Sequence, residues 1–129
     1  MSRLKSNVIP PVILQSLEPH WQCVIDERGH DVPLTVVDQL NTWGEAPIHI
    51  AAWKGTAADV VWLLGNGAEL EQPGAHGMTP LHYAYMGANP GNIEALLKAG
   101  ADPTARTHMG LLPGDGSTAE GLRAERDRW

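Results

Sequence analysis

The sequence lacks the features that would cross-link a small protein or anchor it in a membrane. Among its 129 residues there is one cysteine, Cys23, so no disulfide bond can form within the chain. No stretch approaches the roughly 20 apolar residues of a spanning helix. The apolar run at 8–14 contains two prolines and is followed by no small-residue cleavage site, unlike a signal peptide. We therefore expect a cytoplasmic protein that does not bind membranes.

Basic residues and phenylalanine are also scarce. The chain has 9 Lys and Arg residues and 15 Asp and Glu residues, which gives a formal net charge of −6. It contains no Phe, although it has 5 Trp. A negative chain repels phosphate backbones, so we expect no nucleic-acid partner. The charge suits a basic protein partner or, more commonly, simple solubility.

Enzyme signatures are missing. The sequence contains no Walker loop, no nucleophile elbow and no zinc-protease motif. Cys23 lies in an apolar segment beside Trp21, which favours a buried thiol over a nucleophile. Asp115 and Glu120 are too isolated to be argued as an acid–base pair. We expect no catalytic residues and no cofactor.

The feature that organises the sequence is an internal repeat of 33 residues, without gaps. The recurring residues are Gly44, Gly77 and Gly110; Pro47, Pro80 and Pro113; His49 and His82; Ala51 and Ala84; Leu63-Leu64 and Leu96-Leu97; and Gly67-Ala68 and Gly100-Ala101. So many matches in the same order exclude chance.

Each copy carries helix signals in the same places. Thr79 suits the N-cap of a helix whose first residue is Pro80, where the missing N–H costs nothing. Further along, Val60, Leu63 and Leu64 form an apolar stripe at helical spacing. Gly67 then falls where a left-handed C-cap is expected. Each copy is predicted to be a helix, a turn, a second helix and an extended loop.

These copies resemble ankyrin repeats. The segment 77–84, Gly-Met-Thr-Pro-Leu-His-Tyr-Ala, looks like the opening signature of the family, and 96–102, Leu-Leu-Lys-Ala-Gly-Ala-Asp, looks like its closing signature. The resemblance implies an all-α solenoid in one domain. We divide it into a degenerate N-terminal cap at 1–40, repeats at 41–73 and 74–106, and a C-terminal cap at 107–129.

The two ends depart from the repeat. Upstream we predict short helices at 11–17 and 19–28, with Gly29 as the C-cap of the second. Downstream, residues 117–120 read Ser-Thr-Ala-Glu, a capping-box pattern that would begin a charged terminal helix.

In ankyrin proteins the loop tips and the exposed face of the first helix usually bind the partner. Carried onto matching positions, this implies a concave surface of Thr42, Trp43, Glu45, Trp53, Lys54, His76, Met78, Met86, His108, Met109 and Leu111. The surface is rich in Trp and Met, residue types that suit interfaces. The alternative is that Trp43 and Trp53 fold back and pack against neighbouring repeats.

The histidines divide into two groups. The resemblance implies that His49 and His82 hydrogen-bond backbone groups and tether adjacent loops. His76 and His108 lie near consecutive loop tips, where a shared zinc is conceivable, but no Cys or carboxylate completes a ligand set. We expect no metal site, and a pH-sensitive contact remains open.

These observations favour a monomeric, non-enzymatic module that binds another protein through its concave face. A narrower alternative is an inhibitor or immunity-type protein that neutralises a basic toxin or enzyme. A metal-binding or enzymatic protein is the third hypothesis, and it has the least support.

Overall fold

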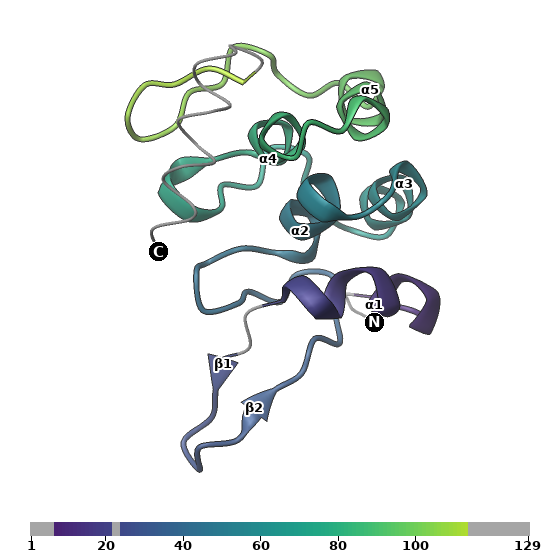
Figure 1. Ribbon diagram of the computed structural model, residues 1–129, viewed down its shortest axis with the longest axis vertical. Helices are drawn as coiled ribbons and strands as arrows, with labels where there is room; N and C mark the ends of the chain where they lie inside the picture. The colour runs from purple at the N-terminus through teal and green to yellow at the C-terminus, as the bar shows by residue number, and fades with distance from the viewer. Residues whose placement is uncertain (1–6, 22–23, 114–129) are drawn as a thin grey trace.

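The computed structural model describes residues 7–21 and 24–113 of the chain, and it shows pairs of helices stacked side by side with loops projecting to one side (Figure 1). The elements in chain order are α1 (Pro11–Leu17), the 3-10 turn η1 (Glu18–His20), β1 (Val24–Ile25), β2 (Asp31–Val32), α2 (Pro47–Lys54), α3 (Ala57–Gly65), the 3-10 turn η2 (Ala75–Gly77), α4 (Pro80–Met86) and α5 (Pro90–Lys98). This is the all-α repeat solenoid that the sequence predicts, with one small hairpin added.

The first helix of each repeat begins, and the second ends, where the sequence places them. Pro47, Pro80 and Pro90 are the first residues of their helices, so no backbone donor is lost. The Thr79 hydroxyl accepts the His82 N–H at 3.5 Å. After the second helix of each pair, Gly67 and Gly100 adopt φ of +106° and +102°. A residue with a side chain would be strained there, so these glycines end the helices.

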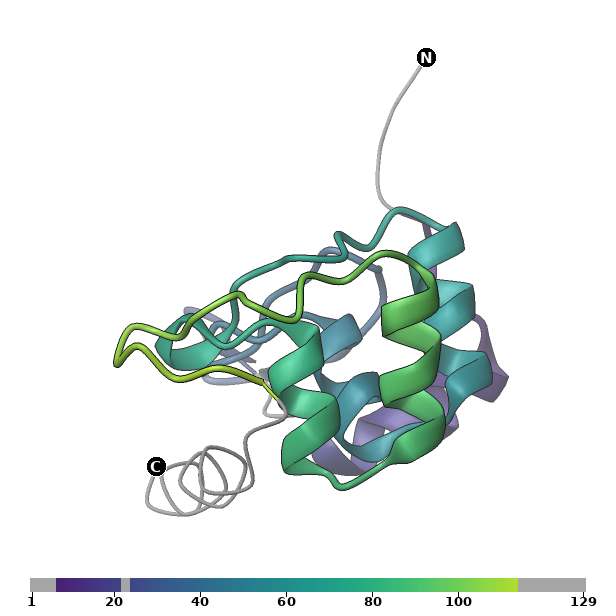
Figure 2. The same cartoon turned by 90° about the horizontal axis from the view of Figure 1, so that it is seen from above.

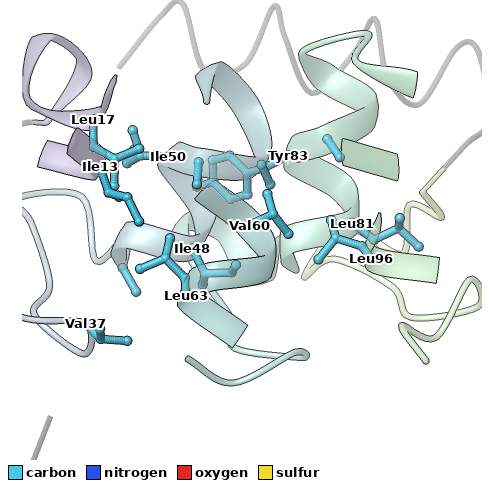
Figure 3. Close-up of a cluster of buried hydrophobic side chains, with 14 of the residues drawn as sticks. Ile13, Leu17, Val37, Ile48, Ile50, Val60, Leu63, Leu81, Tyr83 and Leu96 are labelled. Carbon is cyan, nitrogen blue, oxygen red and sulfur yellow. The ribbon is translucent and has the colours of Figure 1, made fainter. Parts of the chain in front are cut away.

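Each helix pair buries its apolar side against the next pair. The first helices, α2 and α4, lie together, and the second helices, α3 and α5, form the outer layer (Figure 2). Ala51, Ala52 and Ala84 are fully buried, and their small side chains allow α2 and α4 to approach closely. A continuous core runs through the stack, with Tyr83 in its middle (Figure 3). The larger buried side chains around it include Ile48, Ile50, Val60, Leu63, Leu81 and Leu96.

The prediction of a helix at 19–28 is wrong. Among the described residues of that range only the 3-10 turn Glu18–His20 is helical, and β1 and β2 then pair antiparallel, with Val24 opposite Val32. Asp26 explains the difference. Its Oδ1 accepts the N–H groups of Arg28 and His30, both at 2.9 Å. This side-chain-stabilised turn competes with a helix, and Gly29 takes φ +83° within it instead of capping a helix.

The prediction of a helix at 11–17 is confirmed, because α1 spans Pro11–Leu17. The chain before it pairs with the segment that follows the hairpin. Ile9 N–H donates to Thr35 O at 2.9 Å, and Val37 N–H donates to Asn7 O at 3.0 Å. Ile13 and Leu17 then bury the inner side of α1 against the stack. The segment after the hairpin therefore forms part of the cap.

The predicted repeat boundaries enclose the helix pairs, with α2 and α3 inside 41–73 and α4 and α5 inside 74–106. The terminal helix predicted to begin at 117 lies outside the described residues. None of the helices in the described part is both long and apolar enough to cross a lipid bilayer.

The cap of α2 yields a stability prediction. Ala46 occupies the N-cap with extended backbone and offers no side-chain acceptor, whereas Thr79 caps α4. We expect Ala46→Thr to raise the free energy of unfolding by about 1 kcal/mol, which corresponds to a Tm increase of roughly 3–5 °C. Thermal and urea unfolding would measure it. Thr79→Ala is the matched control and should lower stability by a similar amount. An unchanged or lower midpoint for Ala46→Thr would contradict this account of the cap.

Candidate protein-binding surface

Three loop tips of the same construction project from the stack. Each is closed by a backbone hydrogen bond at the same point of the repeat: Asn41 N–H to Glu45 O at 2.9 Å, Gly74 N–H to Met78 O at 2.8 Å, and Thr107 N–H to Leu111 O at 3.0 Å. Inside each closure the repeat glycine turns the chain with positive φ, between +74° and +82°. The third tip shows that the repeat pattern continues past the last complete helix pair.

The tips also contact one another. His108 N–H donates to the carbonyl of His76 at 3.0 Å, which joins the second and third loops. The ring of His108 lies directly against Gly77, where any side chain would collide with the imidazole. Glycine is therefore required at 77 for both its backbone angle and the close approach of the next loop.

The structure exposes most of the residues that the resemblance assigned to partner binding. Thr42, Trp43, Lys54, His76, His108 and Met109 are exposed, Trp53 and Leu111 are partly buried, and Glu45, Met78 and Met86 are buried. Trp43, His76 and Met109 occupy one equivalent position, directly before the glycine of each loop. We call these three residues the tip row. Trp43 is 36% exposed and Met109 is 72% exposed.

Placing Glu45 on the exposed surface was wrong. Its side chain is fully buried, where Oε2 accepts the Tyr83 hydroxyl at 2.6 Å and Oε1 accepts the Asn41 amide at 2.9 Å. Asn41 Oδ1 in turn accepts the backbone N–H of Glu45 at 2.8 Å. Tyr83 OH also accepts the Ala75 N–H at 3.3 Å. Glu45 is therefore part of a buried polar network that joins two repeats.

Exposure was also predicted wrongly for Met78 and Met86. Met78 follows the glycine of its loop, as Glu45 does, and is 0% exposed. The backbone returns to an extended conformation after the left-handed glycine, and the following side chain lies inside the structure. Met86 ends α4 and is 1% exposed, as part of the core. Both thioethers fill internal space, a common role for methionine.

Trp53 combines packing with partial exposure. Its ring is half-buried and packs against the core, and its backbone carbonyl lies so close to Gly87 that a side chain at 87 would collide with it. On the ring face, Lys54 Nζ lies 4.6 Å from the centroid, within cation–π range. The structure thus supports the packing alternative for Trp53 more than for Trp43.

His49 and His82 tether the loops, as the resemblance implied. His49 Nδ1 accepts the Ala46 N–H at 2.9 Å, and its Nε2 bonds Gln72 O at 2.6 Å. His82 repeats this arrangement, with the Thr79 N–H at 3.1 Å and Leu111 O at 2.9 Å. Each imidazole links the start of its helix to the loop that follows the second helix of the same repeat. Burial lowers the pKa of His49 to about 4, and burial also lowers the pKa of His82.

A second surface lies on the connection before α2 and on the loops that follow α3 and α5. A crevice of about 30 Å³, enough for one or two water molecules, opens beside Ala46 and Ile48, with Asp38 and Glu69 at its edge. Farther along, Glu71 Oε2 accepts the N–H of Asp102 at 2.8 Å. Asp38, Glu69, Glu71 and Asp102 are all exposed, and we call them the acidic edge. In the described part, no three His, Cys, Asp or Glu residues converge as metal ligands would.

Comparison with known proteins identifies the architecture. The family model for ankyrin repeats (3 copies) matches residues 22–107. The chain belongs to the ankyrin-repeat family. Ankyrin repeats are general protein–protein interaction modules, so binding another protein is the broad class of function to which this fold belongs.

The curated relatives carry ankyrin repeats in different settings. The chain is 37% identical over 79 residues to human ankyrin repeat domain-containing protein 37, covering 60% of this chain and 46% of that protein. It is 34% identical over 79 residues to mouse protein phosphatase 1 regulatory subunit 27, covering 61% and 51%. Human SH3 and multiple ankyrin repeat domains protein 2 matches at 37% over 71 residues, 54% of this chain and 4% of that protein. The chain thus spans about half the length of the first two relatives.

The ankyrin stack has a further polar contact between repeats that the sequence analysis missed. Asn92 is fully buried in α5, and its Nδ2 lies 3.1, 3.0 and 3.1 Å from the carbonyls of Ala51, Ala52 and Gly55, at the end of α2. Ala51 O also accepts the Gly55 N–H at 2.8 Å, and Gly55 O also accepts the Asn89 amide at 3.3 Å. The last carbonyls of a helix lack the partners that a further turn would supply, and Asn92 supplies a donor to them. The signal available in the sequence was a polar residue in an otherwise apolar helix, matched one period earlier by Asp59.

Because His49 and His82 are buried, we expect the free energy of unfolding of this ankyrin fold to fall in mild acid. In the unfolded chain the pKa of His49 returns from about 4 to 6.5. As the pH falls through this window, the unfolded chain takes up a proton that folded His49 does not. The free energy of unfolding therefore falls with pH, by on the order of 3 kcal/mol for His49. The lowered pKa of His82 acts in the same direction.

Urea unfolding at a series of pH values across this window measures the effect. His49→Gln is the control, because glutamine does not titrate and the variant should lose much of the pH dependence whatever its absolute stability. If both proteins showed the same slope, protonation of His49 would not be linked to unfolding.

Proposed function

We propose that this protein is a non-enzymatic module that binds one partner protein through the concave face formed by its loop tips and first helices. The observation that carries the proposal is the tip row: Trp43, His76 and Met109, at one equivalent position of three loops of the same construction, all exposed. Solvated loop tips are usually polar, and exposed aromatic and apolar side chains in a row are typical of interfaces.

The surroundings of the tip row suit binding. The loops are held by backbone closures and by the His49 and His82 tethers, so little conformational entropy remains to be lost when a partner binds. Trp43 supplies a large rigid contact, and Met109 a flexible one that adapts to an uneven surface. Lys54 is the last residue of α2 and is exposed, so it adds a cation to the first-helix part of the proposed face.

We expect truncation of the tip row to weaken binding while the fold stays intact. Photo-crosslinking from position 109 in the native host would identify the partner, and crosslinking from exposed Val61 on α3 would give the background. With that partner purified, Trp43→Ala should lower affinity by about 2 kcal/mol, roughly thirtyfold. Met109→Ala should lower it severalfold.

Val61→Ala is the matched control, because Val61 is 59% exposed on the outer helix layer. It should bind as the wild type does. Thermal unfolding separates the two roles of Trp43. A Trp43→Ala protein that melts early yet binds normally while folded would refute the interface assignment.

A second candidate function is inhibition of a basic protein or enzyme, in the manner of an immunity protein. The acidic edge favours it, because its four exposed carboxylates lie on three successive connections of a chain with net charge −6. Such a surface accelerates association with a basic partner. The resemblance to a phosphatase regulatory subunit shows that a related protein carries the name of an enzyme regulator.

Association kinetics test this second candidate. With the crosslinked partner, Asp38→Asn combined with Glu69→Gln should lower the association rate constant about threefold or more at low salt, with little change at high salt. Glu94→Gln is the control, since Glu94 is exposed on α5 and lies 4.0 Å from Lys98. Equal rates for all three proteins would exclude a steering role for the acidic edge.

A further inference from the structure

The dipeptide Asn66-Gly67 ends α3, and it has a chemistry that the other asparagines of the chain lack. The chain contains Asn7, Asn41, Asn66, Asn89 and Asn92, and of these only Asn66 precedes a glycine. The main-chain nitrogen of the following residue can attack an asparagine side-chain carbonyl. A following glycine favours this attack, because it has no side chain in the way and a freely rotating backbone.

The glycine side of this bond is open. Gly67 is exposed, and apart from its own chain neighbours no atom of the described residues lies within 4 Å of the point where a Cβ would stand. Within the described residues, no group accepts a hydrogen bond from its N–H. The nitrogen that would act as nucleophile is therefore accessible to water and base.

The asparagine side is held in place. Asn66 Nδ2 donates to Trp62 O at 2.8 Å, so the side chain points back along α3. From the N-terminal segment, Asn7 Nδ2 donates to Asn66 O at 2.9 Å and lies 3.3 Å from Asn66 Oδ1. The side chain must release Trp62 before its carbonyl can turn towards Gly67. Asn7 is exposed at the edge of the cap, so its hold on Asn66 can open without unfolding of the core.

We propose that Asn66 is a deamidation site whose rate is controlled by the contact with Asn7. In the open state the Gly67 nitrogen loses its proton to base and bonds to Cγ of Asn66. The Cγ–Nδ2 bond then breaks, and the nitrogen leaves as ammonia after taking up a proton. The product is a five-membered succinimide. Water adds to either of its carbonyls and opens the ring, leaving aspartate or isoaspartate at position 66.

The product disrupts the site that restrained the reaction. A carboxylate at 66 cannot donate to Trp62 O, and it introduces negative charge at the C-terminal end of α3, which already carries the negative end of the helix dipole. Isoaspartate also lengthens the main chain next to Gly67, whose left-handed conformation shapes the turn. Deamidation therefore loosens the end of α3 and the attachment of the N-terminal segment.

Peptide mapping by mass spectrometry tests the proposal on the full chain, incubated at physiological temperature and mildly alkaline pH. We expect a mass gain of about one dalton confined to the peptide with Asn66, while the peptides with Asn41, Asn89 and Asn92 stay unchanged. Asn66→Ala reproduces Ala99, the equivalent residue of the next repeat, and should abolish the gain.

A separate experiment tests whether the contact with Asn7 limits the deamidation rate. Asn7→Ala should raise the rate about fivefold, the change that one lost hydrogen bond produces in a local opening equilibrium. Val12→Ala, 70% exposed on α1, is the matched control and should leave the rate unchanged. Absence of modification at Asn66, or equal modification of the other asparagines, would overturn the site. An equal deamidation rate in Asn7→Ala and Val12→Ala would show that the contact with Asn7 does not set the rate at Asn66.

Discussion

The hydrogen bond from the Tyr83 hydroxyl to the buried Glu45 carboxylate is the contact on which the arrangement of the two repeats depends. A buried carboxylate is costly unless it is fully hydrogen-bonded, so the first loop must bring Glu45 to Tyr83 and Asn41 to Glu45. The Tyr83 ring also lies 4.9 Å from the ring of His49, which tethers the following loop. One tyrosine of α4 thus sets the position of the loop that carries Trp43.

Polar contacts of this kind recur between successive units, and they determine where the loops lie. The His49 and His82 side chains join helix starts to loops, and Asn92 joins α5 to the end of α2. Because all three contacts are directional, they specify one register of stacking, while apolar burial supplies most of the attraction. Repetition of that register brings equivalent residues of successive loops into a row.

The two surfaces considered for binding differ in their physical character. The tip row offers apolar area on loops that are already ordered, which favours affinity and slow dissociation. The acidic edge offers charge on the connection before α2 and on the loops after α3 and α5, which favours fast encounter with a basic protein. These contributions are separable by salt dependence, and both can serve one partner that contacts the projecting loops.

The sequence by itself determined the repeat length, the helix starts at Pro47 and Pro80, the left-handed glycines and the tethering histidines, because each depends on local backbone chemistry that recurs every 33 residues. It did not reveal the hairpin at 24–32, because apolar spacing there fits a helix until the Asp26 turn is considered. Only the tertiary structure decided that Glu45, Met78 and Met86 are buried. Whether a loop residue points inward depends on partners far away in the chain, as Tyr83 is for Glu45. A local sequence pattern does not identify such distant partners.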